Sequence, residues 1–262
     1  HEITSPLRAT RDRLSHAFAA LENKSRRSGY FGNNMLLGNQ ATQDTTVIFQ
    51  FQAPPEALEL PRLYWRARIY DHYENGMWNT SKTAKGTFTP QNGNLPIPDT
   101  VQRQEYEFAI TTYAQSQAIL SLPSQPLWTS RPMDITSFNL PNGEQDLVVL
   151  ETFPFLEPGE TYYARAYIAN PTAPQLRASG EDYPDWVVER YLQLPENFSS
   201  RVADFAKQAT VGAETPFDKA KAITAALRTQ VLYKSSIILP PKGTDLMEWF
   251  LFEGREGYCN YY

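Results

Sequence analysis

The sequence predicts a multidomain chain of mixed α and β structure, with an antiparallel, sandwich-like β domain first and a mainly helical region after it. Apolar and polar side chains alternate through much of residues 45–168, and this two-residue period is typical of half-buried strands. Prolines and the Asn75-Gly76 turn signal divide that span into roughly eight short strands. Beyond residue 180 the apolar spacing becomes helical. The domains we expect are 1–43, an N-terminal helix and linker, 44–170, the β domain, and 171–262, the helical region.

Each part shows its own local pattern. Residues 6–22 repeat leucine and phenylalanine at near-helical spacing after a Ser5-Pro6 start, which predicts a surface helix. The alternating segments predict strands near residues 47–51, 63–69, 106–112, 118–122, 146–151 and 160–168. Prolines at positions 171 and 174 mark residues 169–180 as a linker.

The helical region contains one strong start signal. Thr215-Pro216-Phe217-Asp218 places a capping hydroxyl, a first-turn proline and a carboxylate at the start of a helix over 215–231. Apolar spacing and prolines also predict the shorter helices 184–192 and 199–209. An extended segment over 232–239, a turn at 240–243 and a short helix over 244–252 should follow.

Composition excludes several classes of protein. The 262 residues are 41% apolar and 13% aromatic, as in a folded globular chain, and the net charge of −5 without a long basic run argues against a nucleic-acid partner. No apolar run approaches the ~18 residues that a membrane-spanning helix needs. A single cysteine, Cys259, allows no internal disulfide, so it does not indicate the redox compartment.

Cys259 is the strongest candidate for a catalytic residue. An apolar run at 249–252 leads into the charged, glycine-bounded segment 253–257, and the cysteine comes two residues after Gly257. Such a segment suits a chain that reverses and then starts a helix, whose first amides and dipole favour a thiolate. A lone cysteine is more often a small buried apolar residue, and this alternative stays open at the level of the residue alone.

The surroundings of Cys259 resemble a known nucleophile motif. Gly257-Tyr258-Cys259, followed by the aromatic Tyr262, is similar to the start of the catalytic helix in the transglutaminase-like superfamily. Segments 191–195, 215–220 and 70–78 resemble its bacterial, membrane-anchored, multidomain branch. The resemblance implies that 171–262 is the helical N-terminal portion of a papain-like α+β transglutaminase-like domain. It also implies that Cys259 is the nucleophile and that this region lies on the extracytoplasmic face of the cell membrane.

The resemblance also implies partners that the sequence does not show. In the family a histidine downstream of the cysteine acts as its base, and an aspartate further downstream orients that histidine. His1, His16 and His72 all lie upstream of Cys259 and match no family position. We therefore expect a catalytic domain that is truncated just after its cysteine and is inactive by itself.

The oxyanion donors are only partly predicted. Backbone N–H groups around Cys259 are one expected donor. A second donor is unidentified, and Tyr233 and Trp249 are candidates only by residue type.

The expected reaction is attack of a thiolate on a protein or peptide amide, giving an acyl-enzyme that passes to an amine or to water. The residues do not separate an acyltransferase from a cysteine protease. A cell-surface binding or scaffolding module with a non-catalytic transglutaminase-like domain is the alternative.

We expect no cofactor and no metal, because no acidic or Cys/His cluster has ligand spacing. One expected partner is a protein or peptide substrate, for which the cell envelope is a candidate source. The other is a second copy of the chain, which would bind through the exposed face of an incomplete domain. Contact with the membrane is expected only through segments outside this chain.

Two further groups have competing interpretations. Tyr70, Asp71, Tyr73 and Trp78 could form a carbohydrate or peptide platform, but a hairpin whose aromatics cover the open end of the sandwich is the favoured interpretation. Glu253, Arg255 and Glu256 could contact substrate, but charges beside glycines in a tight loop more often hold or solvate the loop.

Overall fold

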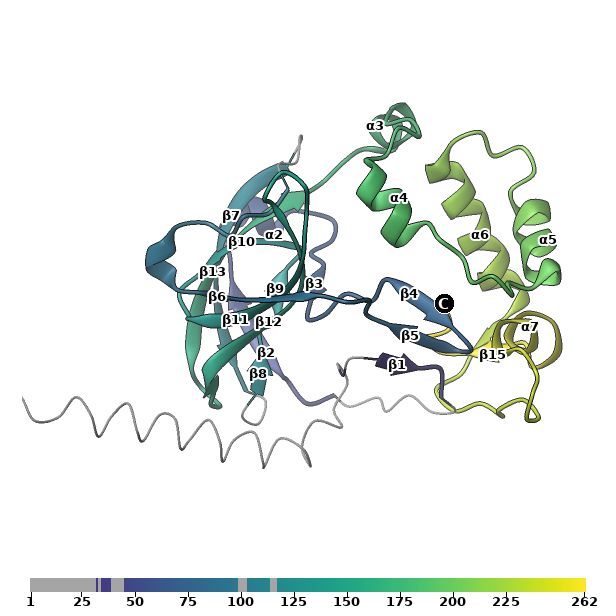
Figure 1. Ribbon diagram of the computed structural model, residues 1–262, viewed down its shortest axis with the longest axis horizontal. Helices are drawn as coiled ribbons and strands as arrows, with labels where there is room; N and C mark the ends of the chain where they lie inside the picture. Colours follow the sequence, from purple (N-terminus) through teal and green to yellow (C-terminus); the bar gives the residue numbers. More distant parts are fainter. Residues whose placement is uncertain (1–31, 33, 39–44, 99–102, 114–116) are drawn as a thin grey trace, which may run out of the picture.

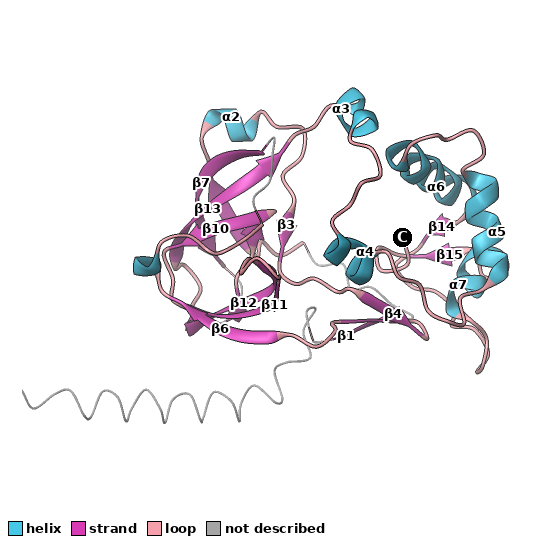
Figure 2. Cartoon of the chain, turned by 45° about the horizontal axis from the view of Figure 1, so that its top comes forward, coloured by secondary structure: helices cyan, strands magenta, loops and turns pink. Residues whose placement is uncertain are grey.

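The computed structural model describes residues 32, 34–38, 45–98, 103–113 and 117–262 (Figure 1). It has mostly antiparallel sheets together with several helices. Figure 2 shows a β-rich region, formed by most of residues 45–169, and a helical region, residues 170–262, with β4 beside the helices. The helix expected over 6–22 lies outside the described residues. Within the described ranges no helix is both long enough and apolar enough to span a bilayer.

One four-stranded antiparallel sheet has the order β10-β13-β7-β2. Its strands are β2 (Phe49–Gln52), β7 (Arg103–Thr112), β10 (Gln125–Thr129) and β13 (Thr161–Ala169). β7 and β13 pair from Arg103–Ala169 to Thr111–Thr161, and Phe108 and Ile110 point to the buried face. The alternation predicted over 106–112 is therefore confirmed.

The second four-stranded antiparallel sheet has the order β6-β11-β12-β8. Its strands are β6 (Ala84–Phe88), β8 (Gln117–Ile119), β11 (Met133–Asn139) and β12 (Gln145–Leu156). Shorter elements complete the region: α2 (Pro55–Leu58), β3 (Trp65–Arg66), the 3₁₀ turn η1 (Pro90–Asn92) and β9 (Leu122–Pro123). The strand expected over 63–69 is shortened to β3, because its partner β9 offers only two residues for pairing.

Both sheets contribute side chains to one core cluster, which runs from Ala57 to Ile168. An aromatic group lies at its edge, where the Trp65 ring centroid is 4.7 Å from that of Phe49 and 5.9 Å from that of Phe108. Burial of such rings is the main source of stability in a β-rich core.

The helical region begins with α3 (Ala173–Ala178) and α4 (Asp185–Tyr191), followed by α5 (Ser200–Ala209) and α6 (Pro216–Gln230). Thr215 Oγ1 accepts a hydrogen bond from the Asp218 amide at 3.2 Å, and Pro216 takes the first helical position, as predicted. The segment expected to be a plain linker contains α3, because the Gln175 side chain accepts a hydrogen bond from the Thr172 amide at 2.8 Å and closes a capping box.

A small three-stranded antiparallel sheet, order β1-β5-β4, lies against the helical region (Figure 1). Its strands are β1 (Asn34–Leu36), β4 (His72–Glu74) and β5 (Met77–Asn79). Asn75 and Gly76 join β4 to β5 with φ of 50° and 77°, the positive values that the sequence predicts for this turn.

The aromatic side chains of this hairpin do not cover the sandwich-like core, which corrects the favoured interpretation. Tyr73 and Trp78, with ring centroids 5.3 Å apart, pack on the core of the helical region together with buried Leu37, Phe250 and Tyr261. The alternation of side chains along the hairpin can be seen in its local sequence. Which core the hairpin packs against depends on contacts with residues more than 150 positions away, such as Phe250 and Tyr261. Strands from the first third of the chain therefore complete the core of the helical region, which we call the second core.

Helix α4 joins the two regions. The Tyr191 hydroxyl donates to the Asp146 carboxylate on β12, and the Arg190 guanidinium carbon lies 3.1 Å from the centroid of the Phe138 ring on β11. Gln193 Nε2 donates to the Asp71 carbonyl at 2.7 Å, so the hairpin is held by the same contact area. Burial raises the pKa of the Asp146 carboxyl and of the Tyr191 phenol.

Candidate functional site

The segment that leads to Cys259 begins with a capped helical turn. Asp245 Oδ1 accepts hydrogen bonds from the amides of Met247 and Glu248, both at 2.9 Å, and starts α7 (Leu246–Glu248). A π-helical turn, η2 (Trp249–Glu253), follows directly and ends where the Gly254 amide donates to the Trp249 carbonyl at 2.8 Å. The short helix predicted over 244–252 is present as this pair of turns.

Two glycines allow the chain to turn tightly after η2. A Cβ on Gly254 would lie 2.5 Å from Trp249 Nε1, and a Cβ on Gly257 would lie 2.5 Å from Phe250 Cε2. Between them Arg255 takes a φ of 52°, in the left-handed region. Only glycine fits at position 257 without displacing the buried Phe250 ring.

A two-stranded parallel pairing holds the far side of this turn. β15 (Glu256–Gly257) pairs with β14 (Leu232–Tyr233), and the Leu232 and Lys234 amides donate to the Arg255 and Gly257 carbonyls, both at 2.8 Å. The Lys234 ammonium also contacts the Glu256 carboxylate. The end of α6 is thereby fixed to the turn that precedes Cys259.

Cys259 is exposed, and its neighbours are buried. Tyr258 and Tyr261 are 2% and 5% exposed, and Tyr261 donates from its hydroxyl to the Gly38 carbonyl at 2.8 Å. The Tyr261 amide donates to the Tyr258 carbonyl at 2.8 Å, so Cys259 lies in a hydrogen-bonded turn, and the helix start that the sequence predicts there stays a prediction. Its Sγ lies 3.5 Å from Asn260 Oδ1. The turn presents the thiol to solvent while two anchored tyrosine side chains fix the backbone on either side.

Among the described residues, His72 is the one histidine, and it makes no contact with the Cys259 thiol. His72 Nε2, on β4, lies 3.8 Å from Glu74 Oε2, while the hydrogen bond of Cys259 is to Asn260. His1 and His16 lie outside the described residues. A base for the thiol is therefore not identified among the residues that the structure describes.

The two oxyanion candidates chosen by residue type differ in their surroundings. Trp249 Nε1 donates to the Ile238 carbonyl at 3.2 Å and is occupied by that structural bond. Tyr233 is half-exposed, and its ring centroid lies 5.9 Å from that of Tyr262. Tyr233 stays a prediction.

The charged residues of the glycine-bounded segment contact the scaffold. Arg201 on α5 lies 3.2 Å from the Glu248 carboxylate and 3.4 Å from that of Glu253, with its guanidinium 4.3 Å from the centroid of the Phe252 ring. The Ser199 hydroxyl, and then Arg201, hold the pKa of the Glu248 carboxyl below its ordinary value. These contacts favour the structural interpretation of Glu253, while Arg255 contributes through its backbone.

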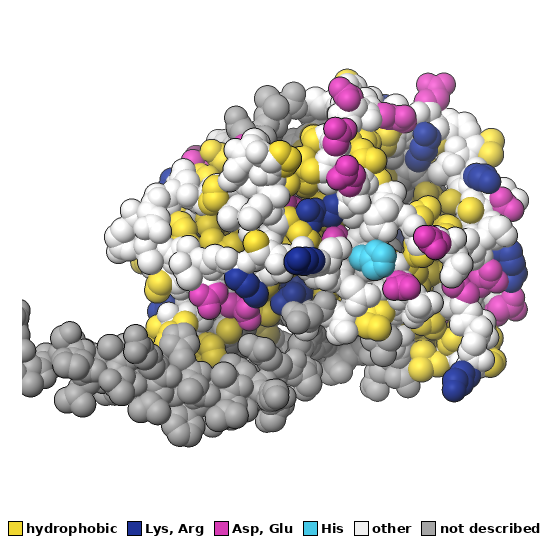
Figure 3. Space-filling view, in the orientation of Figure 1, with side chains coloured by type: hydrophobic (Ala, Val, Ile, Leu, Met, Phe, Trp, Pro, Cys, Tyr) yellow, Lys and Arg dark blue, Asp and Glu magenta, His cyan; other side chains and the backbone are white. Residues whose placement is uncertain are grey.

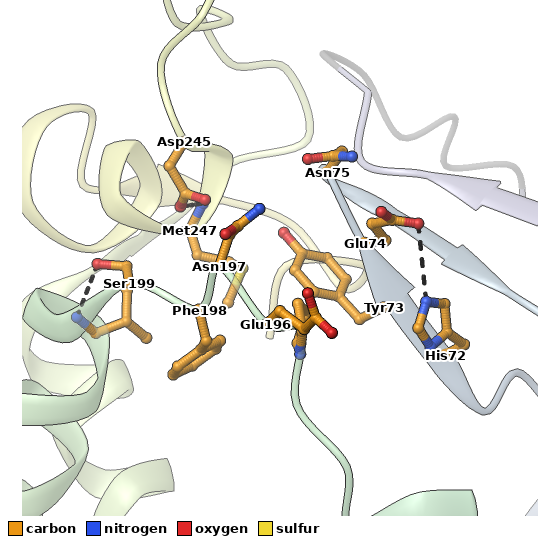
Figure 4. Close-up of a pocket in the computed structure, with 12 residues that line it drawn as sticks. His72, Tyr73, Glu74, Asn75, Glu196, Asn197, Phe198, Ser199, Asp245 and Met247 are labelled. Atoms are coloured by element: carbon orange, nitrogen blue, oxygen red, sulfur yellow. Dashed lines mark hydrogen bonds and ion pairs between the residues drawn. The ribbon is translucent and has the colours of Figure 1, made fainter.

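A pocket of about 220 Å³ lies beside the second core, between the β4–β5 turn, residues 195–199 and the start of α7. Figure 4 shows Tyr73 and the acidic side chains of Glu196 and Asp245 around this space. The sequence analysis singled out Tyr73 but did not relate residues 195–199 to the hairpin, because no local pattern connects the two segments. Among the described residues, no group of three His, Cys, Asp or Glu side chains could hold a metal ion.

No protein-family model matches the chain. Over 250 residues it is 23% identical to a Bacillus subtilis (strain 168) protein, "Uncharacterized protein YebA". The alignment covers 88% of this chain and 32% of that protein. The chain thus spans about a third of the length of this relative.

Comparison of folds finds two similar solved structures. The chain is similar to the crystal structure of the periplasmic domain of TgpA from Pseudomonas aeruginosa, with a TM-score of 0.54 and 18% identity, over 89% of this chain and 74% of that one. The same domain bound to ethylmercury gives a TM-score of 0.53 and 17% identity, with 89% and 75% covered. The chain therefore shares an α+β fold with the TgpA periplasmic domain.

Proposed function

We propose that the intact protein is an extracytoplasmic, membrane-anchored thiol enzyme of the transglutaminase-like superfamily, with Cys259 as its nucleophile. The observation that carries this proposal is the exposed thiol of Cys259 on a turn fixed by buried Tyr258 and Tyr261. The motif at 257–262 and the fold shared with the periplasmic domain of TgpA support it. On this proposal residues 44–170 form a sandwich-like domain, and residues 171–262 are the N-terminal portion of the catalytic domain.

The proposed chemistry begins with the Cys259 thiolate, whose Sγ attacks the carbonyl carbon of a protein or peptide amide. The C–N bond breaks, the amine or ammonia leaves with a proton, and a thioester joins Sγ to the acyl group. A second amine or a water molecule then takes the acyl group and restores the thiol. We propose that a histidine oriented by an aspartate, both supplied from outside this chain, moves the protons, and that backbone amides near Cys259 and a second donor hold the oxyanion.

The test uses the full-length protein and two assays, incorporation of a fluorescent primary amine into a protein and cleavage of peptides. We expect Cys259→Ser and Cys259→Ala to abolish the activity, because neither side chain supplies a thiolate. Ser236→Ala, at an exposed position in the loop after β14, is the matched control and should retain it. Activity that survives unchanged in both cysteine variants would contradict the proposal.

The thiol can be tested independently of turnover. Ethylmercury binds soft thiolate ligands, and Cys259 is the only cysteine of the 262 residues. We expect one equivalent to bind the chain and none to bind Cys259→Ser, as measured by mass spectrometry under non-denaturing conditions. A chain that takes up no ethylmercury until it is denatured would show that the thiol is not accessible.

A binding module with a non-catalytic domain is the second candidate. The observation that favours it is a group of exposed apolar side chains near β14, with Leu232 57% and Ile238 79% exposed. Such surface is suited to contact with another protein, and a second copy of the chain is the simplest occupant. Sedimentation velocity over a range of concentrations should then show a dimer that Ile238→Ser weakens. If the chain is a monomer at every concentration, this second candidate is contradicted and the enzyme proposal is the one that stands.

A further inference from the structure

The pocket beside the second core has the form of a small ligand site. Its floor and walls come from three segments far apart in the chain, residues 72–75, 195–199 and 245–247, with Val202 of α5. Tyr73, Phe198 and Met247 supply apolar and aromatic surface to a volume of about 220 Å³. A pocket with apolar walls and a few convergent polar groups is the usual form of a site for a small molecule or a single side chain.

The charged groups of the pocket are mainly acidic. Three carboxylates line it, those of Glu74, Glu196 and Asp245, and none of the described lining residues is a lysine or an arginine. The one histidine of the lining, His72, places its Nε2 3.8 Å from Glu74 Oε2. Within the described part of the chain Glu196 makes no ion pair or hydrogen bond, and Asp245 uses Oδ1 to cap α7. In the space-filling view the cyan histidine beside β4 has acidic side chains next to it (Figure 3). The pocket therefore repels anions and attracts cations.

The inner wall carries a polar atom that is not satisfied. The Tyr73 hydroxyl oxygen is buried and has no hydrogen-bond partner among the described residues. Burial, and then the charge of Asp245, raise the pKa of Tyr73 to about 12, and the nearby Gly76 backbone opposes the rise without forming a hydrogen bond of normal geometry, so the hydroxyl is a neutral group next to a carboxylate. In Figure 4 the Tyr73 side chain lies between the Asn197–Asp245 side of the pocket and the Glu74–His72 side. A buried polar group that has no partner within the protein gains stability when a ligand supplies one.

The set of groups selects one class of cation. Two carboxylates that form no ion pair among the described residues, the amide oxygens of Asn75 and Asn197, and two aromatic rings suit a compact group with several N–H donors. The carboxylates do not converge as metal ligands would, since no group of three metal-ligating side chains was found in the described ranges. We infer that this pocket binds a primary ammonium group on an apolar stem, such as a lysine side chain, through Glu196, Asp245 and the Tyr73–Phe198 wall.

Binding at this pocket does not depend on the thiol chemistry proposed above. Tyr73 belongs to the same core cluster as Tyr258 and Tyr261, but Cys259 does not line the pocket. The experiment can therefore use the chain with Cys259→Ala, which keeps the buried tyrosines and removes the thiol. Loss of enzymatic activity and loss of ammonium binding are then separate results.

The probe is Nα-acetyl-lysine methylamide, and its Nε-acetylated form, which lacks the charge, is the control compound. We expect the first compound alone to shift backbone amide signals of residues 72–75, 195–199 and 245–247 in a ¹⁵N-correlation spectrum, with saturation below about 20 mM. Equal shifts with both compounds, shifts confined to other residues, or no shifts would each overturn the inference.

Two variants tie the binding to the named groups. Glu196→Gln, at an exposed position that does not support the core, should weaken the affinity for the lysine probe by roughly threefold to tenfold. Tyr73→Phe should weaken it by a smaller factor, because only the unpartnered hydroxyl is removed. Glu189→Gln, at an exposed carboxylate of α4 that does not line the pocket, is the matched control and should bind like the parent. Equal affinity of the Glu196→Gln and Glu189→Gln variants would contradict the assignment.

Discussion

At the scale of single residues, Gly257 shows how closely the cysteine turn is packed. Phe250, the ring that a Cβ at this position would meet, is 1% exposed and cannot move aside. We expect Gly257→Ala to lower the free energy of unfolding by about 1 to 3 kcal/mol, the usual cost of inserting a group into a filled core. Urea unfolding monitored by circular dichroism measures the change.

The control for that variant is Gly86→Ala. Gly86 lies in β6, where an added Cβ meets nothing within 4 Å. Its replacement should leave the unfolding free energy nearly unchanged or slightly raised. Equal losses in the two variants would mean that backbone freedom, and not the contact with Phe250, decides the effect at position 257.

Tyr73 predicts a change of stability with pH. Its folded-state pKa is raised from 10 to about 12, mainly by burial. The unfolded chain loses the phenol proton first, so this contribution to stability is fully present below pH 10 and is lost as pH rises from about 10 to 12. We expect Tyr73→Phe to make the fall of unfolding free energy over this range shallower, as measured by urea titrations at several pH values.

Tyr64→Phe serves as the control for this pH dependence. Tyr64 is 63% exposed, so its removal should leave the alkaline fall of stability as steep as in the parent. Burial also raises the pKa of Tyr261 to about 12. Part of the alkaline fall in unfolding free energy should therefore remain in the Tyr73 variant. A Tyr73→Phe curve that coincides with that of the parent would contradict the assignment.

At the scale of elements, the Tyr191 hydroxyl supports the contact of helix α4 with β12, beside the ion pair of Arg190 with Asp146 at 3.8 Å. Tyr191→Phe removes the hydrogen bond to Asp146 and leaves a largely buried carboxylate with less compensation. We expect a loss of about 1 to 2 kcal/mol in the free energy of unfolding, the typical cost of a buried polar group that loses a partner. Tyr183→Phe, at an exposed tyrosine just before α4, should cost nothing measurable in the same thermal or urea unfolding experiment.

The elements that the sequence predicts correctly carry their signals locally. The start of α6 follows from Thr215, Pro216 and Asp218, which lie next to one another in the chain. The turn between β4 and β5 follows from Asn75-Gly76 alone. By contrast, the strand expected over 63–69 depends on how many residues a distant partner can pair with, and a short-range pattern does not contain that number.

The same distinction explains the candidate site. The motif at 257–262 predicts Cys259 as the nucleophile, and this stays a prediction; the structure adds that a Cβ at Gly257 would meet the Phe250 ring. The turn conformation of Cys259 could not be predicted, because it depends on the Tyr261 hydroxyl reaching Gly38 at the other end of the chain. The sequence does not predict the pocket for a similar reason, since its three segments meet only in the folded chain.

At the scale of the whole molecule, we expect residues 44–170 to fold alone. Their core cluster runs from Ala57 to Ile168 and needs no side chain from the helical region. The fragment should give a β-type circular dichroism spectrum and unfold cooperatively. Within it Trp78, which loses its packing partners in the helical region, should be readily quenched by acrylamide.

Trp128 provides the internal control for that fragment. Its Nε1 donates to the Pro90 carbonyl at 3.0 Å, and both residues lie inside 44–170. Its quenching should be the same in the fragment and in the whole chain, and replacing all the other tryptophans with phenylalanine isolates the signal of Trp78 or of Trp128. A helix-dominated spectrum or non-cooperative unfolding would show that the β-rich region is not independent.

The hairpin that completes the second core also imposes an order on biosynthesis. Trp78 leaves the ribosome long before Phe250 and Leu251, which it joins in the finished core. At translation rates of ~5–20 residues per second the hairpin waits roughly 10 to 35 s for these partners. During that interval the nascent chain presents the aromatic side chains of Tyr73 and Trp78 to whatever chaperone or neighbouring polypeptide is at hand.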